Sequence, residues 1–252
     1  MQVIFNGTGS STGVPQLFCE CPVCRSHDPK NARTRFSMTL KKDSTILQVD
    51  LPFELRIQLL RSGVKHVDGV WLTHPHSDHI AGIDDIRMAS FISGTPIPLF
   101  AGEQTILNAQ KRFPYMFFEN EYVERPFLSP VILNERTIIF KDFEMIPLLH
   151  FHGNMEVYSF RSGNFGFLAD ISSISTHELS KLKGVHVLAV ATTVHRVHER
   201  HMNFDQVIEL IKDIRPEKAF LTHMNHSFDY NTMLKKLPDY IFPAYDGLTI
   251  DL

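Results

Sequence analysis

Trp71-Leu72-Thr73-His74-Pro75-His76-Ser77-Asp78-His79 is the stretch that decides the fold. It begins as an apolar run and ends in three histidines and an aspartate. Residues 68–73 are short, apolar and rich in strand-forming side chains, so they predict a buried strand that leaves His74 at the edge of a sheet. The H-x-H-x-D-H loop carries three imidazoles and one carboxylate, which suit zinc, manganese or iron. These are more ligands than one ion takes from a single loop. The loop therefore predicts two metals about 3.5 to 4 Å apart.

Further ligands are expected at the ends of other strands, because one loop cannot complete two coordination shells. Three more apolar runs end in a suitable side chain. Residues 218–222 lead to His223, residues 164–169 lead to Asp170, and residues 145–149 lead to His150 and His152. The last two histidines lie on the same strand face, so spacing does not choose between them.

Taken in chain order, this series resembles the ligand series of the metallo-β-lactamase superfamily. The resemblance implies an α/β fold of the αββα type, in which two mixed sheets pack face to face with helices outside. It implies one domain over residues 1–252. The resemblance also implies a ligand set. One metal is held by His74, His76 and His152, the other is held by Asp78, His79 and His223, and Asp170 bridges the two.

Length and composition are those of an ordinary soluble protein. The 252 residues are enough for one sizeable core, and they are 43% hydrophobic and 21% charged. The net charge of −3 and the lack of a basic block argue against an extended nucleic-acid surface. The start of the chain has no basic and apolar leader, and no apolar run reaches about 18 residues, so we expect a cytoplasmic protein that does not enter membranes. A homodimer is left open.

The three cysteines of the chain, Cys19, Cys21 and Cys24, lie within six residues. In a reducing compartment, thiols at this spacing predict a structural zinc site rather than a disulfide, and they need a fourth ligand. His226, three residues after His223, is the natural candidate. C-x-C-x2-C near the start with T-H-x-x-H near the end is similar to the PhnP type of the superfamily, the phosphoribosyl cyclic phosphate phosphodiesterases of the carbon–phosphorus lyase pathway.

Residues 7–15, Gly-Thr-Gly-Ser-Ser-Thr-Gly-Val-Pro, follow the first predicted strand. Three glycines within seven residues allow close approach of the backbone, either to a phosphate or merely in a tight turn, and the two interpretations are equally supported. The lysine of a P-loop is missing, which argues against nucleotide binding. Similar G-T-G loops open the phosphodiesterase branches of the superfamily, which favours phosphate chemistry.

Between these motifs, the hydrophobic pattern predicts alternating strands and helices. A helix opened by Pro52 and ended by Gly63 should bury Phe53, Ile57 and Leu60 on one face. Other helices are expected over residues 80–91, 103–112, 175–182 and 204–214, the last with Val207, Leu210, Ile211 and Ile214 inward. The aromatic segment 113–118 fits a pocket wall, a partner surface or plain core packing.

The charges predict a mechanism. A hydroxide between two divalent ions, zinc or manganese, forms near neutral pH and attacks phosphorus, with Asp78 among the groups that hold the ions. By its position, His201 resembles the non-ligand histidine of the family's active site, and it protonates the leaving oxygen or binds the phosphate. The expected substrate is a small phosphorylated molecule, such as 5-phosphoribosyl 1,2-cyclic phosphate, that is opened to a monoester.

Other functions share these ligands. Thioester hydrolysis, lactam hydrolysis and tRNA 3′ processing use the same set, although the glycine loop and the Cys3His pattern argue against the first two and the acidic composition against the third. A further alternative is a binding or redox-sensing module in which the cysteines carry out the function and the metals are only structural. The full set of seven ligands argues against it.

Overall fold

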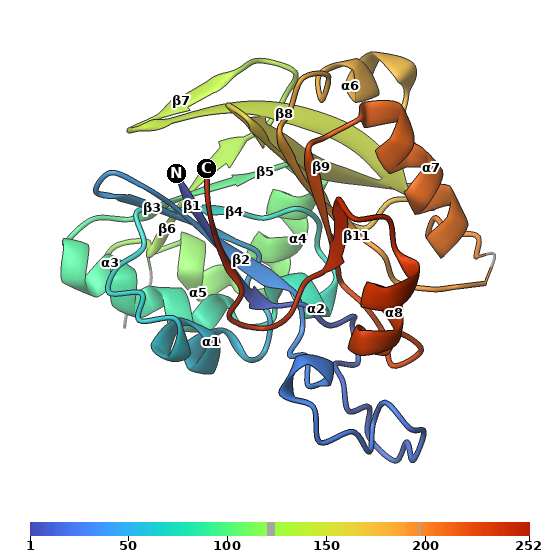
Figure 1. Cartoon of the computed structure of the whole chain (residues 1–252). Helices are drawn as coiled ribbons and strands as arrows, with labels where there is room; N and C mark the ends of the chain where they lie inside the picture. The colour runs from blue at the N-terminus through green and yellow to red at the C-terminus, as the bar shows by residue number, and fades with distance from the viewer. Residues whose placement is uncertain (120–123, 197) are drawn as a thin grey trace.

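Two seven-stranded sheets form the frame of the protein. The computed structural model describes residues 1–119, 124–196 and 198–252. The first sheet has the order β14-β1-β2-β3-β4-β5-β6 and the second β13-β12-β11-β10-β9-β8-β7. In each sheet antiparallel pairs give way to parallel ones, at β3 in the first sheet and at β10 in the second. Helices lie outside the two sheets (Figure 1), so the expected αββα architecture is confirmed.

The strands follow the apolar runs of the sequence. Their bounds are β1 Gln2–Gly7, β2 Ser37–Lys42, β3 Thr45–Val49, β4 Gly69–Trp71, β5 Ile97–Ala101, β6 Leu128–Ile132, β7 Ile138–Phe140, β8 Phe143–His152, β9 Met155–Ser162, β10 Phe165–Leu168, β11 Val187–Ala191, β12 Lys218–Thr222, β13 Ile241–Pro243 and β14 Thr249–Asp251. The helices are η1 Pro29–Asn31, α1 Leu55–Arg61, α2 Ser77–Ile80, η2 Ile83–Ile86, α3 Arg87–Ser93, α4 Glu103–Arg112, α5 Pro114–Phe117, α6 Thr176–Ser180, α7 Phe204–Ile214 and α8 Tyr230–Lys236.

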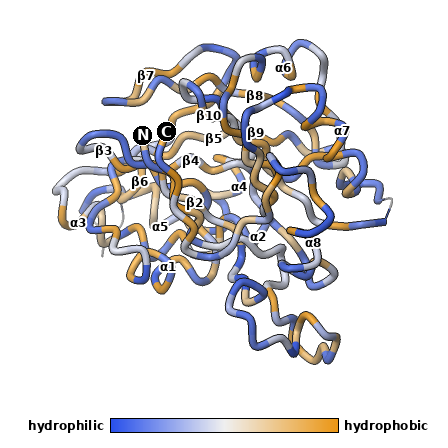
Figure 2. The backbone as a smooth tube through the Cα atoms, viewed as in Figure 1, coloured by the Kyte–Doolittle hydropathy of each residue, from blue (hydrophilic) through white to orange (hydrophobic). Residues whose placement is uncertain are grey.

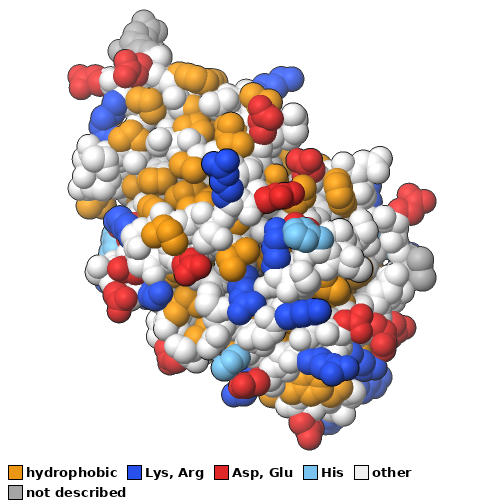
Figure 3. All heavy atoms as spheres, turned by 90° about the horizontal axis from the view of Figure 1, so that it is seen from above, with side chains coloured by type: hydrophobic (Ala, Val, Ile, Leu, Met, Phe, Trp, Pro, Cys, Tyr) orange, Lys and Arg blue, Asp and Glu red, His pale blue; other side chains and the backbone are white. Residues whose placement is uncertain are grey.

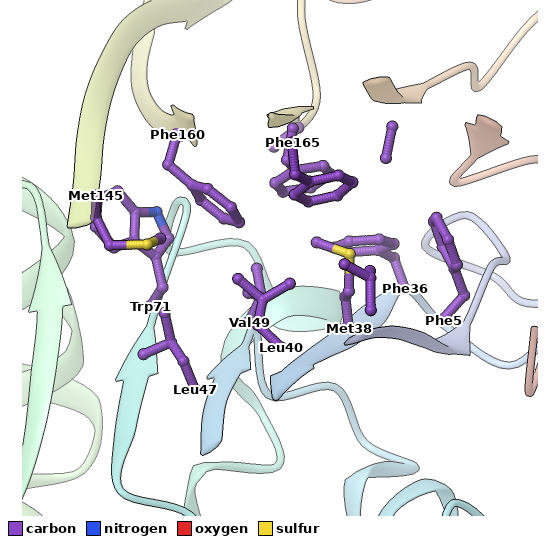
Figure 4. Close-up of a cluster of buried hydrophobic side chains, with 14 of the residues drawn as sticks. Phe5, Phe36, Met38, Leu40, Leu47, Val49, Trp71, Met145, Phe160 and Phe165 are labelled. Atoms are coloured by element: carbon purple, nitrogen blue, oxygen red, sulfur yellow. The ribbon is translucent and has the colours of Figure 1, made fainter. Parts of the chain in front are cut away.

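The main core lies between the sheets (Figure 4). Trp71 from β4 meets Phe160 from β9 edge to face at 5.3 Å between ring centroids, and Phe36 stacks on Phe167 at 5.1 Å. Two further apolar clusters fill the space between each sheet and its helices. Figure 2 shows apolar stretches of the tube along many of the strands, which is the pattern that burial of apolar surface produces.

Helix α7 matches its prediction closely. Its four predicted inward residues are all buried, namely Val207, Leu210, Ile211 and Ile214. Asn203 caps the helix: its side chain accepts from Gln206 N at 3.0 Å, and the Gln206 side chain accepts from Asn203 N at 2.9 Å. This reciprocal pair satisfies two of the free N–H groups at the start of the helix.

The predicted inward face of α1 is wrong. Phe53, Ile57 and Leu60 are exposed, at 56%, 57% and 68%, whereas Leu55 and Gln58 are buried. Gln58 takes the inward position because its amide donates to Thr34 Oγ1 and Arg35 O, both at 2.8 Å. A network of hydrogen bonds to the first sheet thus decides which face of this helix turns inward.

One further expectation needs correction, and one set of alternatives can be decided. The helix expected over residues 80–91 is divided into α2, η2 and α3, because Gly82 N donates to Leu51 O at 2.8 Å and not to a carbonyl of the preceding turn. Gly82 also lies so close to Pro52 that a Cβ would be 2.0 Å from its carbonyl oxygen. In the aromatic segment 113–118, Met116 and Phe117 are buried, so core packing is the correct interpretation for them.

The surface carries mixed charges. Figure 3 shows basic and acidic side chains side by side over the upper face, with apolar side chains between them. Such interspersed charge fits the small net charge of −3. Among the described residues, no helix is long and apolar enough to cross a membrane.

Candidate metal centre

The predicted ligands come from both sheets and meet at one edge of the fold. Each follows a buried strand or lies on the short helix after it, so the sheets fix their positions. His74 and His76 follow β4, Asp78 and His79 lie on α2, His152 ends β8, Asp170 follows β10 and His223 follows β12. His223 has a φ of +57°, a left-handed conformation that is costly for a side chain with a Cβ and that the surrounding structure must hold.

The structure groups these side chains into three sets. In each set the donor atoms lie within 4.8 Å of one another: His74, His76 and Asp170; Asp78, His79 and His223; His152, Asp170 and His201. Asp170 belongs to two of them. Its Oδ2 is 3.8 Å from both His74 Nε2 and His79 Nε2, and its Oδ1 is 3.4 Å from His223 Nε2. Asp170 therefore lies between the two halves of the predicted ligand set, where the bridging position was expected.

The donor atoms of this site fit cations. His79 Nε2 and His223 Nε2 face each other at 3.2 Å, and Asp78 Oδ2 is 3.4 Å from each. Facing lone pairs repel unless a proton or a cation lies between them. In addition, Asp170 Oδ1 is buried and has no hydrogen-bond partner among the described residues. Converging nitrogen and carboxylate donors of this kind suit zinc or manganese.

Asp50 orients two of the histidines, a role that the sequence analysis missed. Because a carboxylate only accepts, His79 Nδ1 donates to Asp50 Oδ2 at 2.7 Å. The Thr73 hydroxyl gives its proton to Asp50 at 2.8 Å and so accepts from His74 Nδ1 at 3.0 Å. Both rings are left with a bare Nε2 that points into the site. The available signal was a lone aspartate at the end of β3, the strand that pairs with β4.

Of the two histidines on β8, the structure brings only His152 to the site. His152 Nδ1 donates to the carbonyl of Arg200 at 2.5 Å, which leaves Nε2 for the site, and its ring lies 5.1 Å from that of His76. His150 is fully buried, and its Nε2 forms a hydrogen bond with Ser159 Oγ at 2.7 Å. Burial lowers the pKa of His150 to about 3. His150 therefore packs in the interior beside the second sheet and is not part of the candidate metal centre.

The electrostatics keep both carboxylates ionised. Burial opposes ionisation, but His79 and His223 hold the pKa of Asp78 well below its usual range, and the surrounding imidazoles do the same for Asp170. Burial likewise opposes the charge on His79, yet Asp78 and neighbouring Asp50 raise the pKa of its imidazole well above the usual value. Both carboxylates are thus available as anionic donors, and a cation that binds His79 Nε2 would take the place of the proton that they attract there.

His201 lies against the same cluster. Its ring centroid is 4.4 Å from that of His152, and its ligand atom lies within 4.8 Å of those of His152 and Asp170. Burial lowers the pKa of His201 to about 4, although Asp170 works in the opposite direction. The structure thus places His201 beside the predicted ligands, within reach of a group bound to them.

A second candidate site holds the cysteines. Cys19 Sγ and Cys21 Sγ lie 3.2 and 3.4 Å from His226 Nδ1, and the four donor atoms of Cys19, Cys21, Cys24 and His226 lie within 4.8 Å of one another. The backbone N–H of Cys24 lowers the pKa of Cys21 to about 6, while burial raises the pKa of Cys24 to about 11. The segment that carries the three cysteines stands away from the sheets, as the blue loops at the bottom of Figure 1 show.

The glycine loop after β1 packs against the protein itself. A Cβ on Gly7 would lie 2.1 Å from Arg35 O, and one on Gly9 would lie 2.7 Å from Arg33 O. Beside the loop, Met224 N donates to Thr8 O at 2.8 Å. The close approach that glycine permits is therefore used by the backbone next to His223 and His226, which favours the turn interpretation.

The comparisons with known proteins agree with this site. A family model described as the beta-lactamase superfamily domain matches residues 44–224, so the chain belongs to the beta-lactamase superfamily. It is similar to a diphosphatase of the PhnP family, with 30% identity and a TM-score of 0.93 over 100% of this chain and 97% of that one. A Zn²⁺-bound PqqB from Methylobacterium extorquens, at 17% identity and a TM-score of 0.78 over 100% of both chains, shares the fold.

One relative joins this fold to a second part. The chain is 31% identical to an octanoyltransferase of Porphyromonas gingivalis over 252 residues, which are 98% of this chain and 51% of that protein. The chain thus spans about half the length of this relative.

Proposed function

We propose that the protein is a metal-dependent phosphodiesterase that opens a small cyclic phosphodiester, such as 5-phosphoribosyl 1,2-cyclic phosphate. The observation that carries the proposal is Asp170, whose two carboxylate oxygens face imidazoles of both halves of the donor set. Such an arrangement suits two ions close together, as hydrolases of phosphate esters use them. The similarity to a PhnP-family diphosphatase supports phosphate rather than acyl chemistry.

In this proposal two divalent ions, zinc or manganese, bind at the edge of the sheets. His74, His76 and His152 would hold one ion and Asp78, His79 and His223 the other, with Asp170 shared between them. The ring of His152 lies 5.1 Å from that of His76, although its donor atom groups most closely with those of Asp170 and His201. A third ion, a structural zinc, binds Cys19, Cys21, Cys24 and His226. When bound, the two catalytic ions acidify water and stabilise negative charge on a phosphoryl group.

The residues of the chain then position and protonate the substrate. Asp50 and Thr73 keep the Nε2 atoms of His74 and His79 turned toward the ions. Water supplies the oxygen that bonds to phosphorus, and the bond to one ester oxygen breaks. His201 gives a proton to that leaving oxygen or donates a hydrogen bond to the phosphoryl group, and it is reprotonated from solvent. The diester becomes a monoester and a free hydroxyl.

A cavity of about 610 Å³ beside His76 and His152 has the size of small-molecule sites. A substrate panel on the metal-loaded protein tests the proposal, with metal content measured in the same samples. We expect hydrolysis of a cyclic phosphodiester, and none of a β-lactam. Loaded protein that leaves every phosphodiester intact would contradict the proposal.

A second candidate is hydrolysis of an acyl thioester. The observation that favours it is the relative named octanoyltransferase, half of which matches this chain along its whole length. An octanoyl thioester therefore belongs in the same panel. Turnover of this compound in preference to cyclic phosphodiesters would assign the site to acyl chemistry.

A further inference from the structure

The middle of the metal-binding loop is held from outside by one side chain. Residues 75–77 lie in the middle of the H-x-H-x-D-H loop, and Arg112 binds two of their polar atoms. Arg112 Nη1 donates to Pro75 O at 2.9 Å, and Nη2 donates to Ser77 Oγ at 3.2 Å. These two contacts lie on either side of His76 in the sequence. The guanidinium therefore binds the loop on both sides of a predicted metal ligand.

Among the described residues, no other hydrogen bond joins residues 75–77 to a distant part of the chain. Locally, His76 O accepts from His79 N and Ser77 O accepts from Ala81 N, both at 3.0 Å. Helix α2, which follows, has four residues and no side-chain cap. A helix of this length is not stable by itself. The loop therefore needs contacts from outside to keep its shape.

His76 also differs from the other predicted ligand histidines in its hydrogen bonds. In the other four, Nδ1 is hydrogen-bonded to the protein, namely to Thr73, Asp50, Thr193 and the carbonyl of Arg200. Such partners fix the orientation of a metal-binding histidine. Among the described residues, the His76 ring contacts only His74 Nε2, at 3.1 Å, and that atom is itself a proposed donor to a metal. The orientation of His76 therefore depends on its backbone, which Arg112 holds.

Helix α4 keeps Arg112 in place. The helix begins two residues after β5, the parallel neighbour of β4, and it buries Thr105, Ile106 and Ala109. Arg112 lies in its last turn, where a cation interacts favourably with the free carbonyl groups. The guanidinium carbon also lies 5.3 Å from the centroid of the Phe113 ring. The arginine thus connects the helix after β5 to the loop after β4.

We propose that Arg112 is a positioning residue of the metal centre, which holds the loop so that the His76 ring faces the ion that it would bind with His74 and His152. The inference rests on the two-ion site of the proposed function, and Arg112 has no contact with the reacting atoms in it. Changing a group that orients a metal ligand typically costs about 10-fold to 100-fold in metal affinity. Because Arg112 is exposed and acts through the backbone, we expect the lower end of this range.

A calorimetric titration with Mn²⁺, after removal of the exchangeable ions, tests this role. Mn²⁺ is a poor partner for thiolates, so the titration reports the imidazole and carboxylate donors. In Arg112→Ala, the ion proposed for His76 should bind about tenfold more weakly. The other ion should bind as in wild type, because Asp50 holds the His79 ring and Leu51 N donates to His79 O at 2.7 Å.

Two single-ligand variants assign the binding steps. His76→Ala removes a ligand of one ion, and His223→Ala removes a ligand of the other. The step that each variant weakens identifies the ion that is affected in Arg112→Ala.

Controls separate positioning from a general effect on the fold. Arg112→Lys should recover part of the affinity, because an ammonium group can donate to one of the two acceptors. Ser77→Ala keeps the contact to Pro75, so its loss should be smaller, and it should add nothing in the Arg112→Ala background because the two residues share one contact. Lys111→Ala, which removes the neighbouring exposed charge of α4, should leave both ions unchanged.

The outcomes distinguish this inference from the function beneath it. Equal weakening of both ions in Arg112→Ala, or unchanged affinity for both with or without a lower melting temperature, overturns the positioning role. If the wild-type protein binds two ions but opens no cyclic phosphodiester, the proposed reaction fails while the role of Arg112 is still decided by the titration. If the wild-type protein binds no pair of ions, both fail.

Discussion

Asp50 offers the sharpest test of the proposed metal centre, because it is buried, touches no predicted ion and still orients two predicted ligands. Its carboxylate accepts from Thr73 N at 2.8 Å, from the Thr73 hydroxyl and from His79 Nδ1. In Asp50→Asn, one oxygen can still accept from Thr73 N. The amide nitrogen then replaces Oδ2 and meets two groups that were donors.

The size of the effect follows from these contacts. The Thr73 hydroxyl can still donate to the remaining oxygen, which it approaches at 3.0 Å, so only His79 Nδ1 loses its acceptor. One buried donor without an acceptor costs about 1 to 3 kcal/mol in the free energy of unfolding. His79 can avoid the clash only by moving its proton to Nε2, the atom that the proposal assigns to the metal. Changing a group that orients a metal-binding histidine typically costs about 10-fold to 100-fold in metal affinity. We expect this loss at the ion held by Asp78, His79 and His223.

The assay is a metal titration of Asp50→Asn against wild type, with thermal unfolding of the metal-free proteins alongside. Thr73→Val is the matched control. It removes the hydroxyl that links Asp50 to His74 Nδ1 and keeps the bond from Asp50 to His79. Its loss of affinity should therefore fall on the other ion. Unchanged affinity for both ions in Asp50→Asn would refute the reasoning.

Three more predictions concern single side chains. His201→Ala should lower turnover on an unactivated cyclic phosphate by about 10² to 10⁴ with metal content unchanged, and much less with a nitrophenolate leaving group; loss of metal would make His201 a ligand. His226→Ala should lose one tightly bound zinc and should melt at a lower temperature, because zinc binding contributes about 10 to 16 kcal/mol in comparable sites. His223→Ala should keep that zinc and lose activity. Metal analysis of both variants checks this prediction, and zinc retained in His226→Ala would contradict it. In metal-free protein at pH 7, Cys21, whose pKa is about 6, should be alkylated before Cys24, whose pKa is about 11, and its rate should fall as the pH drops through 6. Peptide mass spectrometry that finds Cys24 alkylated before Cys21 would contradict this.

The residues that meet at the candidate metal centre were predictable from sequence because strand ends are abrupt. An apolar run that stops at a histidine or an aspartate places that side chain at a sheet edge, and this rule located His74, His152, Asp170 and His223 without any knowledge of the sheet order. The choice of His152 over His150 was favoured on resemblance alone. Only the tertiary structure separates them, since His150 meets Ser159 inside the second sheet.

The missed features depend on contacts between distant segments. The face of α1 was predicted from its apolar residues, but Gln58 turns inward to Thr34 and the backbone of Arg35. Periodicity cannot anticipate a buried polar side chain whose partners lie more than 20 residues away. Asp50 was overlooked for the same reason, because its partners become neighbours only when β3 pairs with β4.

The loop after β12 connects the two candidate metal sites, because it carries both His223 and His226. Met224 lies between His223 and His226 and is held by Thr8, and Arg33 Nη2 donates to Phe228 O at 2.8 Å. The left-handed φ of His223 is therefore supported from the segments around the cysteines. A zinc bound to His226 would fix the far end of the same loop. Under the proposed function, a structural zinc at this place would stabilise the position of His223, a proposed catalytic ligand, and would take no part in the reaction itself.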